Sequence, residues 1–183
     1  MIRGRTVALR PVEDDDLPLI FRWQNDAEVW SSMDYQRPFS TDDIRTDIDR
    51  ARREGHPFVI EVEGRPIGRI GLNGFRTRDR ICALYLFIGE ERDRGEGYAL
   101  DAVSTLVGYA FERNDLARIE LWTLATNERA IEVYEACGFR REAVLPERSW
   151  KDGAWVDHVV MSVTPDGYRD AAAALPASSS DAD

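Results

Sequence analysis

An almost continuously apolar segment, residues 81–88, runs directly into a charged loop that contains glycines, and this sequence feature restricts the possible folds most. Such a segment predicts a strand that is covered on both faces. The loop covers residues 89–97. After it, apolar side chains recur at helical spacing over residues 98–112. A central strand that leads through a glycine loop into an amphipathic helix predicts an α/β fold.

The other segments complete one mixed sheet. Strands are expected over residues 5–12, 57–62, 65–75 and 117–125, and two closing strands within 140–163 are separated by the turn Lys151-Asp152-Gly153. Helices are expected near residues 17–23, from Ser40 or Thr41 to residue 54, and over 128–137 after an Asn127 cap. The aromatic segment 29–39 is not periodic, which predicts a loop or short irregular helices. This order predicts a three-layer α/β sandwich with helices on both faces of the sheet.

The length of 183 residues predicts one domain, over residues 1–165. Residues 166–183 are rich in Ala, Ser, Asp and Pro, which predicts a flexible tail. No signal peptide or membrane span is evident, so a cytoplasmic protein without a membrane partner is expected. Neither Cys82 nor Cys137 has metal-ligand spacing, and no metal is expected. The sequence leaves a homodimer open.

A net charge of −10 argues against a nucleic-acid partner, because proteins that bind nucleic acids usually present a basic face. The charge suits a cationic substrate better. The alternative interpretation is that the acidity serves only solubility or salt adaptation.

The loop Arg94-Gly95-Glu96-Gly97-Tyr98-Ala99 places two glycines where a helix begins. Free backbone N–H groups and the helix dipole create an anion site there, and glycine lets the backbone approach a pyrophosphate closely. A tight connection without a ligand is the alternative. The dinucleotide pattern G-x-G-x-x-G fails, because Leu100 stands where it requires the third glycine.

This loop resembles the (Arg/Gln)-x-x-Gly-x-(Gly/Ala) signature of the GNAT superfamily of N-acetyltransferases. The match runs from Arg94 to Ala99; a second register, from Arg92 to Gly97, is also possible, and one extra residue lies between Ile88 and Arg94. Residues 127–139 are similar to the Asn-x-x-Ala-x-x-x-Tyr-x-x-x-Gly-Phe block of the same superfamily. The resemblance covers about residues 3–165. Residues 150–161 are similar to the ribosomal-protein N-terminal acetyltransferase branch, which also includes polyamine and antibiotic acetyltransferases.

The resemblance implies a GNAT-like, mostly antiparallel sheet and transfer of an acetyl group from acetyl-CoA, a cosubstrate, to a primary amine of a small molecule or a protein N-terminus. Tyr134 is then the general acid that protonates the departing thiolate; the alternative is that Asn127 only caps the helix and Tyr134 packs in the core. The residues expected at the cofactor are Phe87, Ile88, Gly89, Arg94, Gly95, Glu96, Gly97, Tyr98, Ala99, Asn127 and Ala130. A backbone N–H around residues 87–89 is expected to stabilise the oxyanion.

The sequence constrains the general base and the acceptor pocket less than it constrains the cofactor site. Glu120 and Asp157 are candidate bases on strands that border the cleft. His158 alternates with Asp157, so the two side chains are expected to face opposite ways. The residues expected to wall an amine pocket are Trp30, Met33, Asp34 and Tyr35; the alternative is that these side chains only cover the sheet.

Two other classes of function stay open from the sequence. A non-catalytic acyl-CoA-binding sensor would bind the cofactor and release no thiol with any amine. A nucleotide- or NAD-binding module would be stabilised by NAD or ATP instead of acetyl-CoA.

Overall fold

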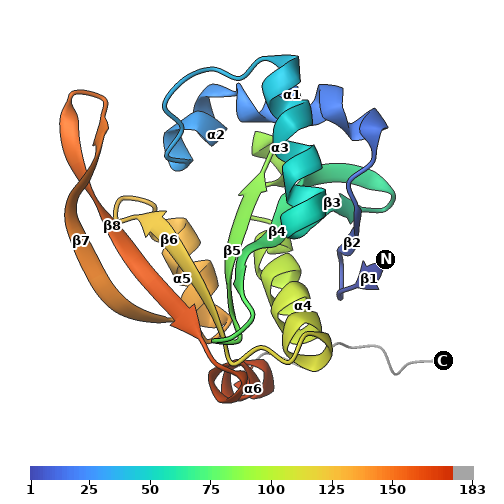
Figure 1. Ribbon diagram of the computed structural model, residues 1–183, viewed down its shortest axis with the longest axis vertical. Coiled ribbons are helices and arrows are strands. Elements are labelled where there is room, and N and C mark those ends of the chain that lie inside the picture. The colour runs from blue at the N-terminus through green and yellow to red at the C-terminus, as the bar shows by residue number, and fades with distance from the viewer. Residues whose placement is uncertain (175–183) are drawn as a thin grey trace.

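One eight-stranded sheet, in the order β1-β2-β3-β4-β5-β6-β8-β7, organises the computed structural model, which describes residues 1–174 (Figure 1). The strands are β1 (Ile2–Arg3), β2 (Ala8–Pro11), β3 (His56–Val62), β4 (Arg65–Arg76), β5 (Ile81–Ile88), β6 (Arg118–Leu124), β7 (Arg140–Lys151) and β8 (Ala154–Val163). Only β5 and β6 are parallel, and every other pair is antiparallel. The predicted mixed, mostly antiparallel sheet is confirmed.

Helices form a layer on each side of this sheet. The helices are α1 (Leu17–Gln24), α2 (Ala27–Ser32), α3 (Thr41–Glu54), α4 (Tyr98–Arg113), α5 (Glu128–Ala136) and α6 (Pro165–Ala174), with 3-10 turns η1 (Asp14–Asp16) and η2 (Glu91–Asp93). Helices α1 to α3 pack on one face and enclose a small core, whereas α4 and α5 pack on the other face around the main core (Figure 1). The three-layer sandwich is therefore confirmed.

Strand β5 contributes to both cores, which explains its almost continuous apolar sequence. Cys82 and Leu84 are buried in the core below α4, and Phe87 is buried in the core below α1 and α3. Successive side chains of a strand point to opposite faces, so a central strand between two helical layers requires apolar residues at both parities.

A gap opens between β5 and β6. The two strands pair only where residues 81–83 face residues 118–120. Beyond that point β5 continues beside β4 while β6 continues beside β8, so their carboxyl ends diverge (Figure 1). The backbone groups on the facing edges have no ladder partner there, so they can form hydrogen bonds with groups other than a neighbouring strand.

The helical layers differ from the sequence prediction at two places. The aromatic segment contains the short helix α2, whose N-cap is Asp26. The predicted flexible tail is wrong over residues 166–174, because they belong to α6; the rest of that tail, 175–183, lies outside the described residues. Tyr168 holds α6 in place by packing closely over Gly108 of α4, a long-range contact that composition does not reveal. Within residues 1–174, no helix has both the length and the apolar character that a bilayer span requires.

Candidate functional site

The loop before α4 has the backbone of an anion site. Gly95 and Gly97 adopt positive φ angles of 85° and 81°, which glycine tolerates and other residues rarely adopt. Helix α4 begins at Tyr98, and its N-cap, Gly97, provides no side-chain hydrogen bond. The first N–H groups of the helix are therefore not capped by the Gly97 position, and the positive end of the helix dipole lies beside them.

An ion pair between the exposed Arg65 and the buried Asp93 fixes the start of this loop. Asp93 in η2 accepts two hydrogen bonds from Arg65, at 2.8 and 2.7 Å. The hydrogen bonds from Arg65 hold the pKa of Asp93 below its usual range, although burial opposes this shift. The glycine loop is thus anchored to β4.

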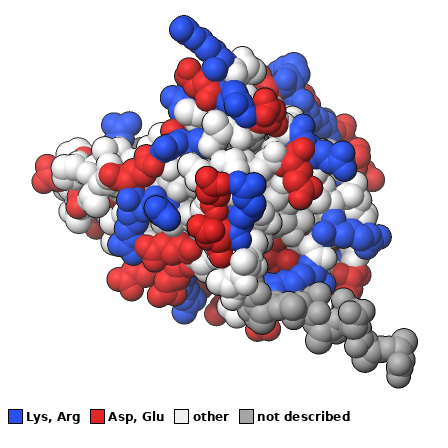
Figure 2. Space-filling view, turned by 90° about the horizontal axis from the view of Figure 1, so that it is seen from below, with Lys and Arg blue, Asp and Glu red and all other residues white. Residues whose placement is uncertain are grey.

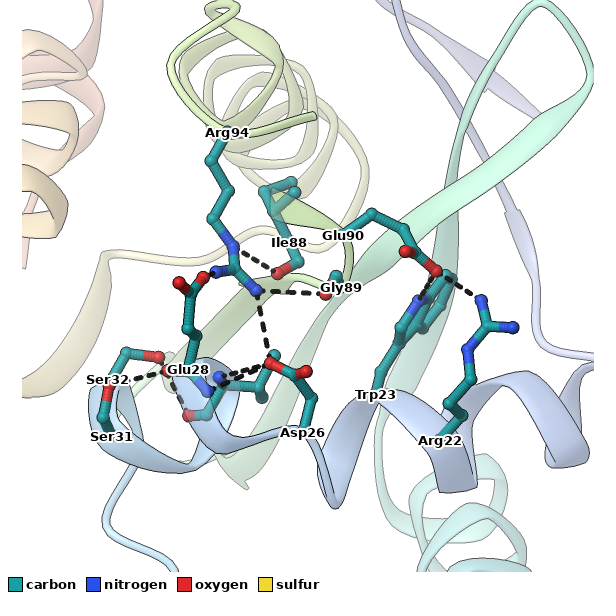
Figure 3. Close-up of polar contacts among 11 residues, drawn as sticks. Arg22, Trp23, Asp26, Glu28, Ser31, Ser32, Ile88, Gly89, Glu90 and Arg94 are labelled. Carbon is teal, nitrogen blue, oxygen red and sulfur yellow. Dashed lines mark hydrogen bonds and ion pairs between the residues drawn. The ribbon is translucent and has the colours of Figure 1, made fainter. Parts of the chain in front are cut away.

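Arg94 points away from the N-terminus of α4 and toward α2 (Figure 3). Its Nε and Nη2 donate to the carbonyl oxygens of Ile88 and Gly89, at 3.3 and 3.0 Å. Its Nη1 pairs with the carboxylate of Glu28, and Asp26 lies 3.8 Å from Nη2. Arg94 thereby joins the end of β5 to the first turn of α2, an arrangement that the sequence pattern did not predict.

The hydrogen bonds at the end of β5 indicate which backbone N–H group can stabilise an oxyanion. The N–H of Gly89 already donates to the carbonyl of Ile67, at 2.8 Å. Because successive N–H groups alternate between the two edges of a strand, the N–H of Ile88 points away from β4 and toward the gap. Gly89 also packs so closely under Trp23 that a Cβ atom there would lie 2.3 Å from the indole.

Helix α5 carries the second predicted block at the β6 side of the gap. The side-chain oxygen of Asn127 accepts a hydrogen bond from the N–H of Ala130, at 3.3 Å, so Asn127 is the predicted helix cap. Tyr134 is buried in the main core, and its ring centroid is 5.6 Å from that of Phe139. No residue of 1–174 hydrogen-bonds its hydroxyl. Burial raises the pKa of Tyr134, which keeps the phenol protonated.

The two candidate bases lie apart from one another. Glu120 lies on the paired part of β6 and accepts a hydrogen bond from Arg76, at 2.8 Å. Asp157 lies beside the end of β6, where its carboxylate accepts from the N–H of Glu147, at 2.8 Å. His158 is buried, with Nε2 2.8 Å from the hydroxyl of Ser149.

Part of the predicted acceptor pocket surrounds a cavity of about 360 Å³ between α3 and the β4–β5 pair. Met33 and Tyr35 line this cavity. Trp30 is outside the lining, and its ring centroid lies 5.9 Å from that of Tyr35. Asp34 is exposed and accepts from Gln36 instead. A larger hollow of about 920 Å³ lies at the β2–β3 edge, and none of the predicted site residues lines it.

The single lysine of the chain connects the β7–β8 hairpin to α2. Lys151, at the tip of the β7–β8 hairpin, donates to the carbonyl oxygens of Trp30, Ser31 and Met33, at 2.9, 2.6 and 2.8 Å. Burial lowers the pKa of Lys151. The hairpin is therefore tied to the C-terminal end of α2, opposite the end that Arg94 holds.

The family of this chain follows from a match over most of its length. A family model described as "Acetyltransferase (GNAT) domain" matches residues 6–140, which is more than half of the chain. The chain belongs to the GNAT acetyltransferase family. It is an N-acetyltransferase with acetyl-CoA as its cosubstrate.

Several acetyltransferases are similar to this GNAT chain over most of its length. A spermidine N(1)-acetyltransferase of Escherichia coli is 26% identical over 173 residues, which span 92% of this chain and 91% of that protein. The structure of a Vibrio cholerae spermidine N-acetyltransferase with CoA and spermine has a TM-score of 0.83 at 24% identity, covering 90% and 98% of the two chains. RimL, a ribosomal L7/L12 alpha-N-protein acetyltransferase in complex with coenzyme A, has a TM-score of 0.78 at 16% identity, covering 88% and 96%.

The surface charge is mixed where it is seen from below. Figure 2 shows acidic and basic side chains side by side over this face. The net charge of −10 is therefore not gathered into one continuous acidic surface there. Among residues 1–174, no group of three or more His, Cys, Asp or Glu side chains has the arrangement of a metal site.

Proposed function

We propose that this GNAT acetyltransferase acetylates a primary amine of a small molecule or of a protein N-terminus by direct attack on acetyl-CoA. The observation that carries the proposal is the divergence of β5 and β6, whose pairing ends at residues 83 and 120, next to the strand end that leads into the glycine loop. The pyrophosphate of the cofactor would bind residues 95–99 at the start of α4, and Asn127 and Ala130 would contact the pantetheine arm.

The acetyl carbonyl would then lie at the end of β5. There the N–H of Ile88, directed into the gap, stabilises the oxyanion of the tetrahedral intermediate. Tyr134 protonates the departing thiolate of coenzyme A; burial raises the pKa of its phenol, which keeps the phenol protonated and also makes it a weaker acid. The attacking amine must be neutral, and Glu120 and Asp157 remain the candidate bases that accept its proton, directly or through water.

The relatives do not identify the acceptor amine. Their names include spermidine and protein N-terminal acetyltransferases, which fits either kind of primary amine and leaves the ribosomal-protein branch a proposal. The acceptor would enter from the side of α1 to α3, where Met33 and Tyr35 line the cavity beside β5. A cytoplasmic setting and a homodimer belong to the same proposal.

Thiol release from acetyl-CoA, measured over polyamines, aminoglycosides, amino acids and N-terminal peptides, tests this function. We expect release that depends on one class of amine, with an acetylated product of matching mass. Acetyl-CoA binding without thiol release for any amine would contradict the proposal and favour a non-catalytic acyl-CoA sensor. Stabilisation by NAD or ATP, and not by acetyl-CoA, would contradict it as well.

A further inference from the structure

A buried arginine lines the cavity proposed for the acceptor. Among residues 1–174, Arg69 on β4 is the only buried arginine, at 2% exposure. It shares the lining of the cavity with Tyr35, Tyr85 and Asp47. A buried guanidinium cation is costly unless close, well-formed hydrogen bonds compensate its charge, so the partners of Arg69 are informative.

The hydrogen bonds of Arg69 are all long. Its Nη1 lies 3.4 Å from Asp47 and 3.5 Å from Gln24, and its Nη2 lies 3.3 Å from the hydroxyl of Tyr85. Its Nε has no hydrogen-bond partner within residues 1–174. Charge-assisted hydrogen bonds are normally about 2.7–2.9 Å long.

The same chain forms much closer arginine pairs elsewhere. Arg10 donates two hydrogen bonds to Asp16, both at 2.7 Å, although Arg10 is more exposed than Arg69. Arg69 is therefore buried without a contact as short as those that Arg10 makes. Its long contacts leave the guanidinium able to bind a further anion.

The nearest carboxylate compensates Arg69 only in part. Asp47 also accepts a hydrogen bond from Arg50, at the shorter distance of 2.8 Å. The charged side chains that line the cavity are Asp47, Glu54, Arg50 and Arg69, so its formal charges balance. A polycationic amine gains no net electrostatic attraction from such a lining.

The tyrosines add donors to the cavity. The hydroxyl of Tyr35 accepts from Gln24, at 3.0 Å, and that of Tyr85 accepts from Arg69. Burial raises the pKa of both phenols, so each keeps an O–H that can donate. A carboxylate, which only accepts hydrogen bonds, fits a cavity with two hydroxyl donors and a guanidinium.

We propose that Arg69 binds a carboxylate of the acceptor, so that the substrate is a primary amine that also carries a carboxylate. This inference rests on the proposed function, because it needs the acceptor in this cavity. Phe87 lines the same cavity and directly precedes Ile88, so an acceptor held at Arg69 extends its amine toward the gap. The volume of about 360 Å³ suits a molecule of amino-acid or dipeptide size.

Matched amines that differ only in the carboxylate test this inference. The pairs are tyrosine with tyrosinamide, β-alanine with β-alaninamide, and a dipeptide with its C-terminal amide; spermidine serves as an amine without an anion. We expect the carboxylate member of at least one pair to have a kcat/KM about tenfold or more above its amide, the scale of a hydrogen bond to a charged group. A parent enzyme that prefers the amides or spermidine would overturn the inference.

Arg69→Met removes the charge and keeps much of the side-chain length. We expect this variant to bring the carboxylate-to-amide ratio close to one, while acetyl-CoA affinity, measured by calorimetry, stays within about twofold. Arg45→Met, an exposed change on α3 outside the cavity, is the matched control and keeps the parent ratio. Tyr85→Phe, which keeps the ring, is expected to lower the ratio in part and provides the test if Arg69→Met does not fold.

The outcomes separate this inference from the proposed function. Acetylation of amines without any carboxylate preference, or a preference that survives Arg69→Met, overturns the role of Arg69 and leaves acetyl transfer intact. If no amine releases thiol, the proposed function fails, and calorimetric binding of the same pairs decides the inference. Tighter binding of the carboxylate member that Arg69→Met abolishes supports it, and equal binding overturns it.

Discussion

The Nη2 of Arg94 donates a hydrogen bond to the backbone carbonyl of Gly89, at 3.0 Å, directly after the last residue of β5 (Figure 3). The same guanidinium pairs with Glu28 at the start of α2. One side chain of the glycine loop thus connects the proposed cofactor site to the helix that borders the acceptor side.

Arg94→Met is expected to lower the free energy of unfolding by about 1–2 kcal/mol, because it removes two hydrogen bonds to carbonyls and a partly exposed ion pair. Acetyl-CoA affinity is expected to fall as well. Arg92→Met is the matched control, because Arg92 is exposed and corresponds to the alternative register of the motif. Urea unfolding and calorimetry measure both quantities. Equal effects of the two substitutions would contradict the role of Arg94.

Gly97→Val is expected to weaken acetyl-CoA binding by about tenfold or more, because a side chain obstructs the approach of the phosphates and the positive φ becomes strained. Gly64→Val separates these two causes. Gly64 has a similar φ of 77° in the β3–β4 turn and, like Gly97, has no neighbouring atom within 4 Å of the position that a Cβ would occupy. A comparable loss of thermal stability in both variants, with weakened cofactor binding only at Gly97, is the expected result. Unchanged affinity in folded Gly97→Val would refute the site.

Tyr134→Phe is expected to lower turnover by roughly 10²-fold or more, the scale of a positioned general acid. The ring is retained, so the core packing and the affinity for acetyl-CoA are expected to change little. Tyr109→Phe, a change at the distant β2–β3 hollow, is the control. Steady-state kinetics with the identified amine provide the measurement. Turnover within about twofold of the parent would assign the proton to water or to another side chain.

Asp101→Asn is expected to destabilise the fold by about 1–3 kcal/mol at pH 7. The carboxylate of Asp101 accepts hydrogen bonds from the N–H groups of Arg5, Thr6 and Val7, at 3.1, 2.7 and 3.0 Å. Burial opposes ionisation, but these hydrogen bonds hold the pKa of Asp101 below its usual range.

The sign of the pH dependence follows from this lowered pKa. The stabilisation is present above the unfolded pKa of about 3.9 and is lost as the pH falls through the lower folded pKa. Urea unfolding at several pH values should therefore show the parent and Asp101→Asn converging in acid. Exposed Asp79→Asn is the control. A difference that stays constant from pH 7 into acid would contradict this account.

Local sequence was sufficient for most elements. The Ser40 cap with Asp42 and Asp43 begins α3, Asn127 caps α5, and Lys151-Asp152-Gly153 separates β7 from β8. These features depend on contacts within a few residues, so propensity and capping rules predict them.

Long-range packing determined the rest. The tail composition predicted no helix over residues 166–174, yet Tyr168 docks α6 against Gly108. Whether Arg94 faces a phosphate or α2 depends on Glu28, which is 66 residues away in the chain. The sequence of β4 does not show that Arg69 is buried. Arg69 lies beside Asp47 and Tyr85 because α3 packs on the sheet. The sequence by itself therefore determined the local elements and the two motifs, whereas the tertiary structure decided the direction of each charged side chain, because burial and partners come from distant segments.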